Sequence, residues 1–155
     1  MNNEDTAVND LASTLKVVLA DTMTMFIKTW GAHWNVEGPN FYEYHKMFGK
    51  IYEELFTAVD DVAEHIRALD VYCPSTYARF AELTTVEDDA KIPSAGVTVE
   101  RVLAANDCVI ASLNKAVEQA KIANDEALIS FLGARLEAHN KHGWFLRATT
   151  KKNRA

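Results

Sequence analysis

Two histidines stand at positions that suit metal binding. His33 lies five residues before Gly38, and His45 lies seven residues after it. Because Gly38 and Pro39 form a turn between two helical patterns, an antiparallel helix pair closed there places both imidazoles at nearly the same level. Two imidazoles at one end of a helical hairpin can bind a transition metal. Each histidine taken alone is more typical of a satisfied core or interface residue.

Asp60 and Glu64 form a second candidate pair. Positions i and i+4 of one helix share a face, so both carboxylates point the same way. Such a pair more often belongs to a solvated acidic face, and Glu53, Glu54 and Asp61 lie nearby.

Helix geometry decides whether the two pairs can meet. His45 and Asp60 are separated by roughly 22 Å along one helix, so one subunit does not bring them to one ion. Two antiparallel copies of this helix, related by a two-fold axis near position 53, place His45 of one copy beside Asp60 and Glu64 of the other. At 100° per residue, His45, Phe56, Asp60 and Glu64 lie to one side of Phe48 on the helix. The sequence therefore predicts a metal site shared across a symmetric dimer.

The elements that position these residues follow from the breaker pattern. The 155 residues include only three prolines and six glycines, enough chain for one domain over 1–155. Apolar residues recur at spacings of three and four. They predict four long helices, over about Asp5–Trp34, Asn40–Asp70, Thr98–Ala123 and Asp125–Thr150. We expect Thr98 and Asp125 to cap the third and fourth helices.

The segment from about Val71 to Val97 breaks the helical pattern, and only Tyr77–Phe80 is typical of a short helix there. A bundle with one long crossover is the ferritin-like arrangement. We therefore expect an all-α, ferritin-like four-helix bundle whose crossover between helices two and three carries a short extra helix. No Glu has a His three residues later, so the usual intrasubunit di-iron motif is missing.

The composition limits the classes of partner. The formal net charge is −6, which favours cations over nucleic acid or anionic membranes. No stretch has the apolar length of a membrane span, and the polar, acidic beginning is unlike a secretory signal. Cys73 and Cys108 form no disulfide framework, and we expect both to be packing residues. A cytoplasmic location is expected.

Over about Leu11–Thr150 the chain resembles the Dps family, the miniferritins of starved or oxidatively stressed prokaryotes. The final helical stretch, Arg135–Ala148, resembles that family's last helix. The remaining similarity rests on a few short motifs, which are His33-Trp34-Asn35, Gly38-Pro39, Asn40-Phe41, His45, and Asp60 with Glu64.

The resemblance implies a shell of twelve subunits that acts as a ferroxidase. Fe(II) would be oxidised, preferably by hydrogen peroxide, between two-fold-related subunits and stored as ferric mineral, which protects the cell from oxidative stress. His33 and His45 would be ligands from one subunit, and Asp60 and Glu64 from its partner. Zn(II) can bind to the same four ligands. Trp34 matches an aromatic residue regarded as a trap for oxidising equivalents; its alternative role is packing.

One position departs from the family pattern. Where an acidic residue usually follows the second histidine by four, this chain has Gly49. A glycine in mid-helix costs roughly 1 kcal/mol relative to alanine and supplies no ligand. Either the second metal position is weakened, with Glu53 or water filling the gap, or Gly49 relieves crowding at the dimer contact. The alternative function is a metal-binding or DNA-coating shell with an impaired ferroxidase centre.

DNA binding is a separate question, since family members often use a lysine-rich tail. The first basic residue is Lys16, and the preceding segment is acidic. The acidic residues there are Glu4, Asp5 and Asp10, and the short basic C-terminal segment contains Lys151, Lys152 and Arg154. Phosphate contacts need clustered basic residues. We expect weak or absent DNA binding at physiological salt, and nucleoid association stays open.

Overall fold

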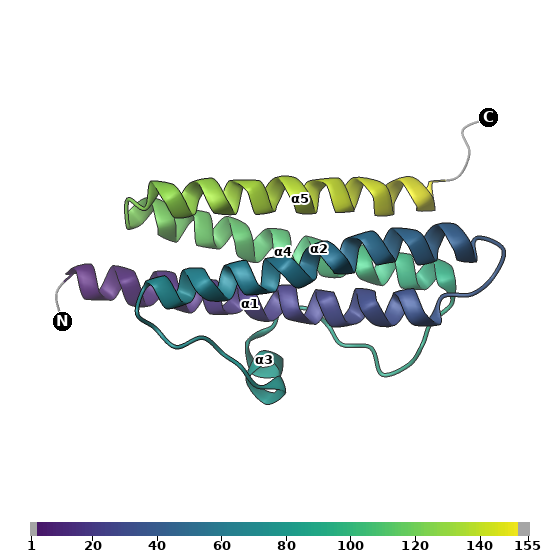
Figure 1. Ribbon diagram of the computed structural model, residues 1–155, viewed down its shortest axis with the longest axis horizontal. Helices are drawn as coiled ribbons and strands as arrows, with labels where there is room; N and C mark the ends of the chain where they lie inside the picture. Colours follow the sequence, from purple (N-terminus) through teal and green to yellow (C-terminus); the bar gives the residue numbers. More distant parts are fainter. Residues whose placement is uncertain (1–2, 152–155) are drawn as a thin grey trace.

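The computed structural model describes residues 3–151, which form a helical bundle (Figure 1). Its helices are α1 (Asn3–Asn35), α2 (Phe41–Ala68), α3 (Tyr77–Leu83), α4 (Ala95–Ile122) and α5 (Glu126–Thr150). The all-α bundle with a short helix in its long crossover is thus confirmed. Lys152 and Arg154, together with the side chains of Glu4 and Asp5, lie outside what the structure describes. Among the described helices, none is apolar over a bilayer's thickness.

Apolar stripes at helical spacing hold the bundle together. α1 packs along both α2 and α4, and α5 packs along α4, whereas α2 and α5 make few contacts. Full burial of one such aliphatic or aromatic side chain contributes about 1.5–3 kcal/mol. The largest fully buried apolar side chains include Leu15, Met25, Phe48, Leu55, Leu113, Leu132 and Leu146. Phe41 is 43% exposed because it stands at the first turn of α2. Cys73 and Cys108 are free thiols packed against the core, as expected.

Of the two predicted N-caps, the structure confirms the one at α5 and contradicts the one at α4. Asp125 caps α5, as predicted, since its side chain accepts from the Leu128 N–H at 2.9 Å. The expected cap at Thr98 is wrong, because α4 begins at Ala95 with Ser94 in the N-cap position. Thr98 lies within the first turn, where its hydroxyl donates to the Ser94 carbonyl at 3.0 Å.

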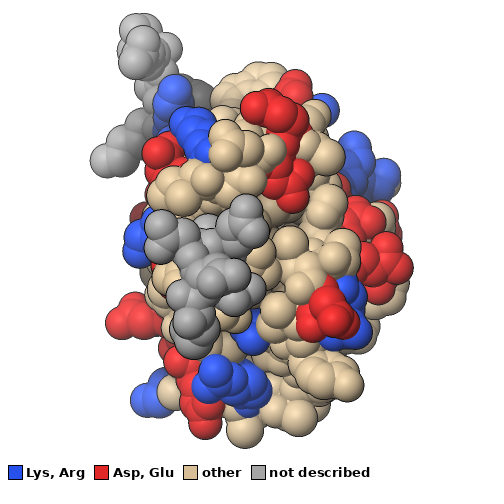
Figure 2. Space-filling model, turned by 90° about the vertical axis from the view of Figure 1, so that its left-hand side faces the viewer, with Lys and Arg blue, Asp and Glu red and all other residues tan. Residues whose placement is uncertain are grey.

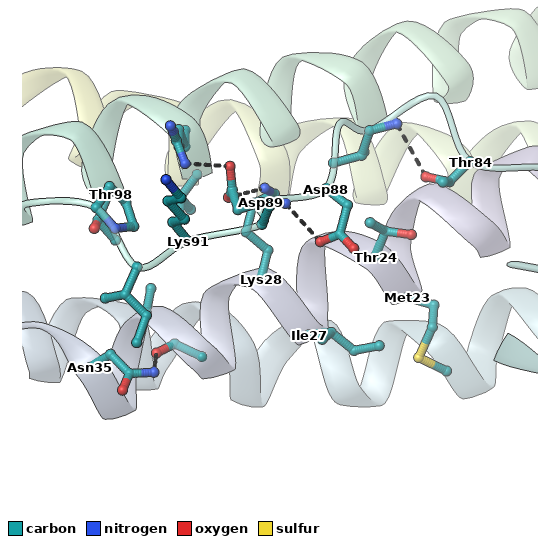
Figure 3. Close-up of a pocket in the computed structure, with 18 of the residues that line it drawn as sticks. Met23, Thr24, Ile27, Lys28, Asn35, Thr84, Asp88, Asp89, Lys91 and Thr98 are labelled. Atoms are coloured by element: carbon teal, nitrogen blue, oxygen red, sulfur yellow. Dashed lines mark hydrogen bonds and ion pairs between the residues drawn. The ribbon is translucent and has the colours of Figure 1, made fainter. Parts of the chain in front are cut away.

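Two carboxylates fix the crossover to the bundle. Asp21 of α1 is fully buried, and its oxygens accept from the Thr84 and Thr85 hydroxyls, each at 2.9 Å. These bonds compensate the burial of a carboxylate, which would otherwise be costly. Asp89 pairs with Lys28 of α1 and, at 2.7 Å, with Arg101 of α4 (Figure 3).

A pocket of about 770 Å³ lies between α1, α3 and the crossover (Figure 3). Met23 and Ile27 of α1, Phe80 of α3 and Ile92 of the crossover line it. None of the four proposed metal ligands lines this pocket, so the chemistry of interest lies elsewhere.

Candidate functional site

The α1–α2 hairpin brings His33 and His45 into direct contact. Gly38 adopts φ +112°, a conformation that glycine reaches without steric cost, and it turns the chain between the helices. The two imidazole rings stack with centroids 3.7 Å apart and an interplanar angle of 21°. The prediction that both histidines lie at one level of the hairpin is confirmed.

Reciprocal hydrogen bonds orient the two rings. The His33 Nδ1–H donates to the His45 carbonyl at 2.7 Å, and the His45 Nδ1–H donates to the His33 carbonyl at 2.8 Å. The His33 carbonyl lies in the last turn of α1, where carbonyls lack partners within the helix. Within residues 3–151 neither Nε2 atom has a hydrogen-bond partner, so its lone pair is available to a ligand. Metal-binding histidines are commonly oriented in this way by a carbonyl on the other nitrogen.

Gly49 lies beneath this pair, one turn after His45 and fully within the protein. A Cβ added at Gly49 would stand 3.4 Å from both Cε1 and Nδ1 of His33. The imidazole of the same chain therefore lies close over the α2 backbone here. A side chain at position 49 would contact the His33 ring of its own subunit, and Gly49 offers no acidic ligand.

Aromatic side chains border the histidines on both sides. Phe41 contacts His45 with ring centroids 5.1 Å apart, and Tyr52 packs edge-on against His33, also at 5.1 Å. Trp34 is 59% exposed and contacts Trp30 at 4.5 Å. The sequence analysis missed Trp30 and Tyr52; the available signal was spacing, since each lies a whole number of helical turns from a site residue.

Asp60 and Glu64 lie on α2, far along the helix from His45, as its unbroken course requires. Both side chains are exposed, and neither makes a hydrogen bond or ion pair among the described residues. No three His, Cys, Asp or Glu side chains within 3–151 converge as a metal-binding group. A single chain therefore brings His33 and His45 together but does not bring Asp60 and Glu64 to them.

A second polar cluster, unexpected from the sequence, lies where α2 faces α5. Glu54, which the sequence showed only as an acidic neighbour of Asp60 and Glu64, is paired, because Arg135 of α5 engages both of its carboxylate oxygens. His142 donates to the same carboxylate at 3.0 Å. Burial alone would raise the pKa of Glu54, but the hydrogen bonds and charges of His142 and Arg135 outweigh it and lower the pKa to about 2.

His139 completes this α2–α5 cluster from within the core. Its Nδ1–H donates to Asn106 Oδ1 at 2.9 Å, and its Nε2 accepts from Arg135 at 3.3 Å. Burial, and then the positive charges of Arg135 and His142, lower the pKa of His139 to about 3, so the imidazole is neutral. A polar stripe at spacings of four and three (Arg135, His139, His142) was the sequence signal for this cluster.

Comparison with known proteins gives consistent matches. Residues 12–155 match the ferritin-like domain family. The chain is 30% identical over 130 residues to DNA protection during starvation protein 2 of Bacillus anthracis, covering 84% of this chain and 89% of that one. It is 31% identical over 132 residues to DNA protection during starvation protein of Brevibacillus brevis, covering 84% and 87%.

Solved structures also show similarity to this fold. A Dps protein from Bacillus brevis superimposes with a TM-score of 0.90 at 27% identity, covering 97% of this chain and 100% of that one. The Dps structure from Thermosynechococcus elongatus gives a TM-score of 0.94 at 24% identity, covering 98% and 97%. The predicted ferritin-like fold is confirmed.

Proposed function

Since the chain belongs to the Dps family of ferritin-like proteins, we propose that it oxidises Fe(II) with hydrogen peroxide at sites shared between two-fold-related copies. The ferric product is stored inside a dodecameric shell in the cytoplasm. The observation that carries this proposal is the reciprocal bonding of His33 and His45, which fixes both rings and leaves both Nε2 lone pairs free.

The exposed face of α2 supports a shared site. Between the histidine pair and the carboxylates lie Tyr52, which is half-buried, and Phe56, which is 67% exposed. A second copy packed antiparallel covers this apolar surface and delivers Asp60 and Glu64 to the partner's imidazoles. Covering exposed aromatic rings adds hydrophobic stabilisation to that contact.

The residues suit iron as a substrate. Two carboxylates supply hard oxygen ligands and negative charge, which favour Fe(II) and still more the Fe(III) product. Neutral imidazole nitrogens add borderline ligands that also accept Zn(II). With Gly49 in place of an acidic residue, one iron position is firm and the second is weak.

The test is Fe(II) oxidation by peroxide, followed by ferric absorbance. We expect the wild type to exceed the rate in buffer and Asp60→Asn to fall to that rate, because the firm position loses a charged ligand. Asp61→Asn is the matched control, since this exposed carboxylate neighbours Asp60 but points to another side of α2. Zn(II) should inhibit the wild type. A wild-type rate equal to that of buffer would reject ferroxidation and leave the alternative, a metal-binding shell with an impaired centre, which Gly49 favours.

A DNA-coating role receives less support. At the end of the bundle that carries the α4–α5 turn, Lys and Arg are interspersed with Asp and Glu rather than gathered (Figure 2). Phosphate binding depends on clustered positive charge. We propose that DNA binding at physiological salt is weak or absent.

A further inference from the structure

The pocket between α1, α3 and the crossover is separate from the histidine pair and combines two kinds of surface. Figure 3 shows Met23 and Ile27 of α1 along one edge and Asp88, Asp89 and Lys91 of the crossover along the other. Its volume of about 770 Å³ lies within the range of small-molecule sites, roughly 300–1,000 Å³. The pocket is therefore large enough to enclose a small organic molecule.

The apolar wall of the pocket is incompletely covered by the protein itself. Ile27, Tyr77 and Ile92 all line it, yet these side chains are 45%, 83% and 71% exposed. Gly31 of α1 lines it too, and a Cβ added there would meet nothing within 4 Å. Open space thus continues over the α1 backbone, and apolar groups gathered around such a space favour an apolar ligand.

The charged side chains of the lining favour an anion. Among the described residues that line the pocket, three carry a positive charge, namely Lys28, Lys91 and Arg101. Only Asp88 and Asp89 carry a negative charge there, so the local excess is a single positive charge, although the whole chain has a formal net charge of −6. An apolar ligand with one negative group therefore complements this pocket better than a neutral or a cationic one.

The two carboxylates do not satisfy all three cations. Lys28 and Arg101 both pair with Asp89, the latter at 2.7 Å, and the Asp88 carboxylate accepts from the Asp89 backbone N–H at 2.8 Å. Within residues 3–151, Lys91 makes no hydrogen bond or ion pair, and Arg101 donates through Nη1 alone. The Lys91 ammonium and the remaining N–H groups of Arg101 are thus available to carboxylate oxygens.

We propose that this pocket binds a medium-chain carboxylic acid in its ionised form. Lys91 and Arg101 bind the carboxylate, and the hydrocarbon chain packs against Ile27 and Phe80. A linear chain suits the shape, because the lining extends along α1 over positions 23–36, roughly 20 Å at 1.5 Å per residue. None of the proposed metal ligands takes part, so this binding is independent of ferroxidation.

The experiment measures octanoate binding to the full-length, assembled protein by isothermal titration calorimetry. Octanol and octylammonium are the comparison ligands, since they keep the chain and replace the carboxylate by a neutral or a positive group. We expect octanoate to bind at one site per chain and at least tenfold more tightly than octanol, because hydrogen bonds to a charged group are the stronger ones. Octylammonium should not bind.

One variant tests the recognition of the carboxylate. Lys91→Gln should weaken octanoate binding about tenfold and leave octanol binding unchanged, because one charge-assisted hydrogen bond is lost. Lys115→Gln is the matched control, since Lys115 is an exposed lysine of α4 that does not line the pocket.

A second variant fills the space for the chain. Gly31→Leu should abolish octanoate binding, because the new side chain occupies the pocket. The fold should tolerate it, since leucine favours a helix over glycine and the added Cβ meets open space. Gly133→Leu in α5 is the matched control, because a Cβ there also meets nothing within 4 Å but lies outside the pocket.

Three results would overturn the proposal. They are a wild type that does not bind octanoate, octanoate binding no tighter than that of octanol, and equal octanoate binding by the wild type and Gly31→Leu. If the wild type does not bind and Gly31→Leu changes the size of the assembly in sedimentation, a second copy of this chain fills the pocket instead. A protein that binds octanoate but does not oxidise Fe(II) supports this inference and rejects only the proposed function, so the two fail separately.

Discussion

Two clusters in this molecule combine histidine with neighbouring polar groups, and they differ in what they leave unpaired. At the α1–α2 hairpin, His33 and His45 each donate from Nδ1–H to a backbone carbonyl, and each Nε2 stays unpaired among the described residues. In the α2–α5 cluster, Arg135 and His142 saturate the Glu54 carboxylate, and both nitrogens of His139 are bonded.

The difference separates a binding site from a structural one. A lone pair that faces the surface can accept a cation, whereas one that already accepts from a guanidinium cannot. In the α2–α5 cluster, Arg135 supplies the positive charge that balances Glu54 inside a single chain. Farther along α2, no cation of the described chain pairs with Asp60 or Glu64, which suits carboxylates that serve a partner's site.

Arg135→Met should have the largest effect on stability, because it removes the positive partner of a largely buried carboxylate. Breaking such a pair costs about 3 kcal/mol, at the low end of the usual range since Glu54 retains contact with solvent. Urea unfolding at fixed protein concentration measures the change, and iron binding by the folded variant should persist.

His45→Gln is the counterpart at the hairpin. It should lower the free energy of unfolding by about 1 kcal/mol, the net contribution of one hydrogen bond, and abolish iron binding. Equal losses of stability in Arg135→Met and His45→Gln would erase the proposed distinction between the clusters.

The next largest effect concerns pH: acid should lower the free energy of unfolding through the α2–α5 cluster. The folded-state pKa of His139 is about 3, below its ordinary 6.5, so only the unfolded chain takes up this proton as pH falls from 6.5 towards 3. The folded-state pKa of Glu54 is about 2, below its ordinary 4.5, so the stabilisation it gives is full above 4.5 and is lost as pH falls towards 2. The free energy of unfolding should therefore fall with acidification, by at most about 1.4 kcal/mol per pH unit for each group. Unfolding of His139→Gln between pH 7 and pH 4.5 should show a shallower slope; an unchanged slope would contradict the assignment.

Gly49→Ala should have the smallest effect. Alanine favours a helix over glycine by about 0.5–1 kcal/mol, but the new methyl group would sit 3.4 Å from His33. Gly133→Ala in α5 is the matched control, since a Cβ there meets nothing within 4 Å. We expect Gly133→Ala to stabilise more in thermal unfolding. The difference between the two variants measures how tightly His33 packs on α2, and a larger gain at Gly49 would show that the contact has no cost.

Much of the fold was predictable because its signals are local. Helical periodicity, the breakers and the Asp125 cap each depend on a few neighbouring residues, and they gave the helices and the long crossover. The level of His33 and His45 followed from counting residues on either side of Gly38. Thr98 failed as a cap because two capping residues, four apart, compete for one helix start.

The α2–α5 cluster was not predictable in the same way. Glu54, Asn106 and His139 come from three helices, and their partnership depends on how these helices pack and rotate about their axes. A charge pattern on one helix gives the face of a residue but not the residue opposite it. The Glu54 carboxylate therefore resembled its solvated neighbours until the position of Arg135 was known.

The sequence by itself determined the helical bundle, the hairpin that aligns the two histidines, and the separation of those histidines from Asp60 and Glu64, since all three follow from periodicity and counting along helices. Only the tertiary structure decided which nitrogen of each imidazole stays free, that the His33 ring fills the space over Gly49, and that Trp30 joins Trp34 to Tyr52. These features depend on contacts between side chains of different helices, and such contacts are fixed by packing rather than by the order of residues along one of them.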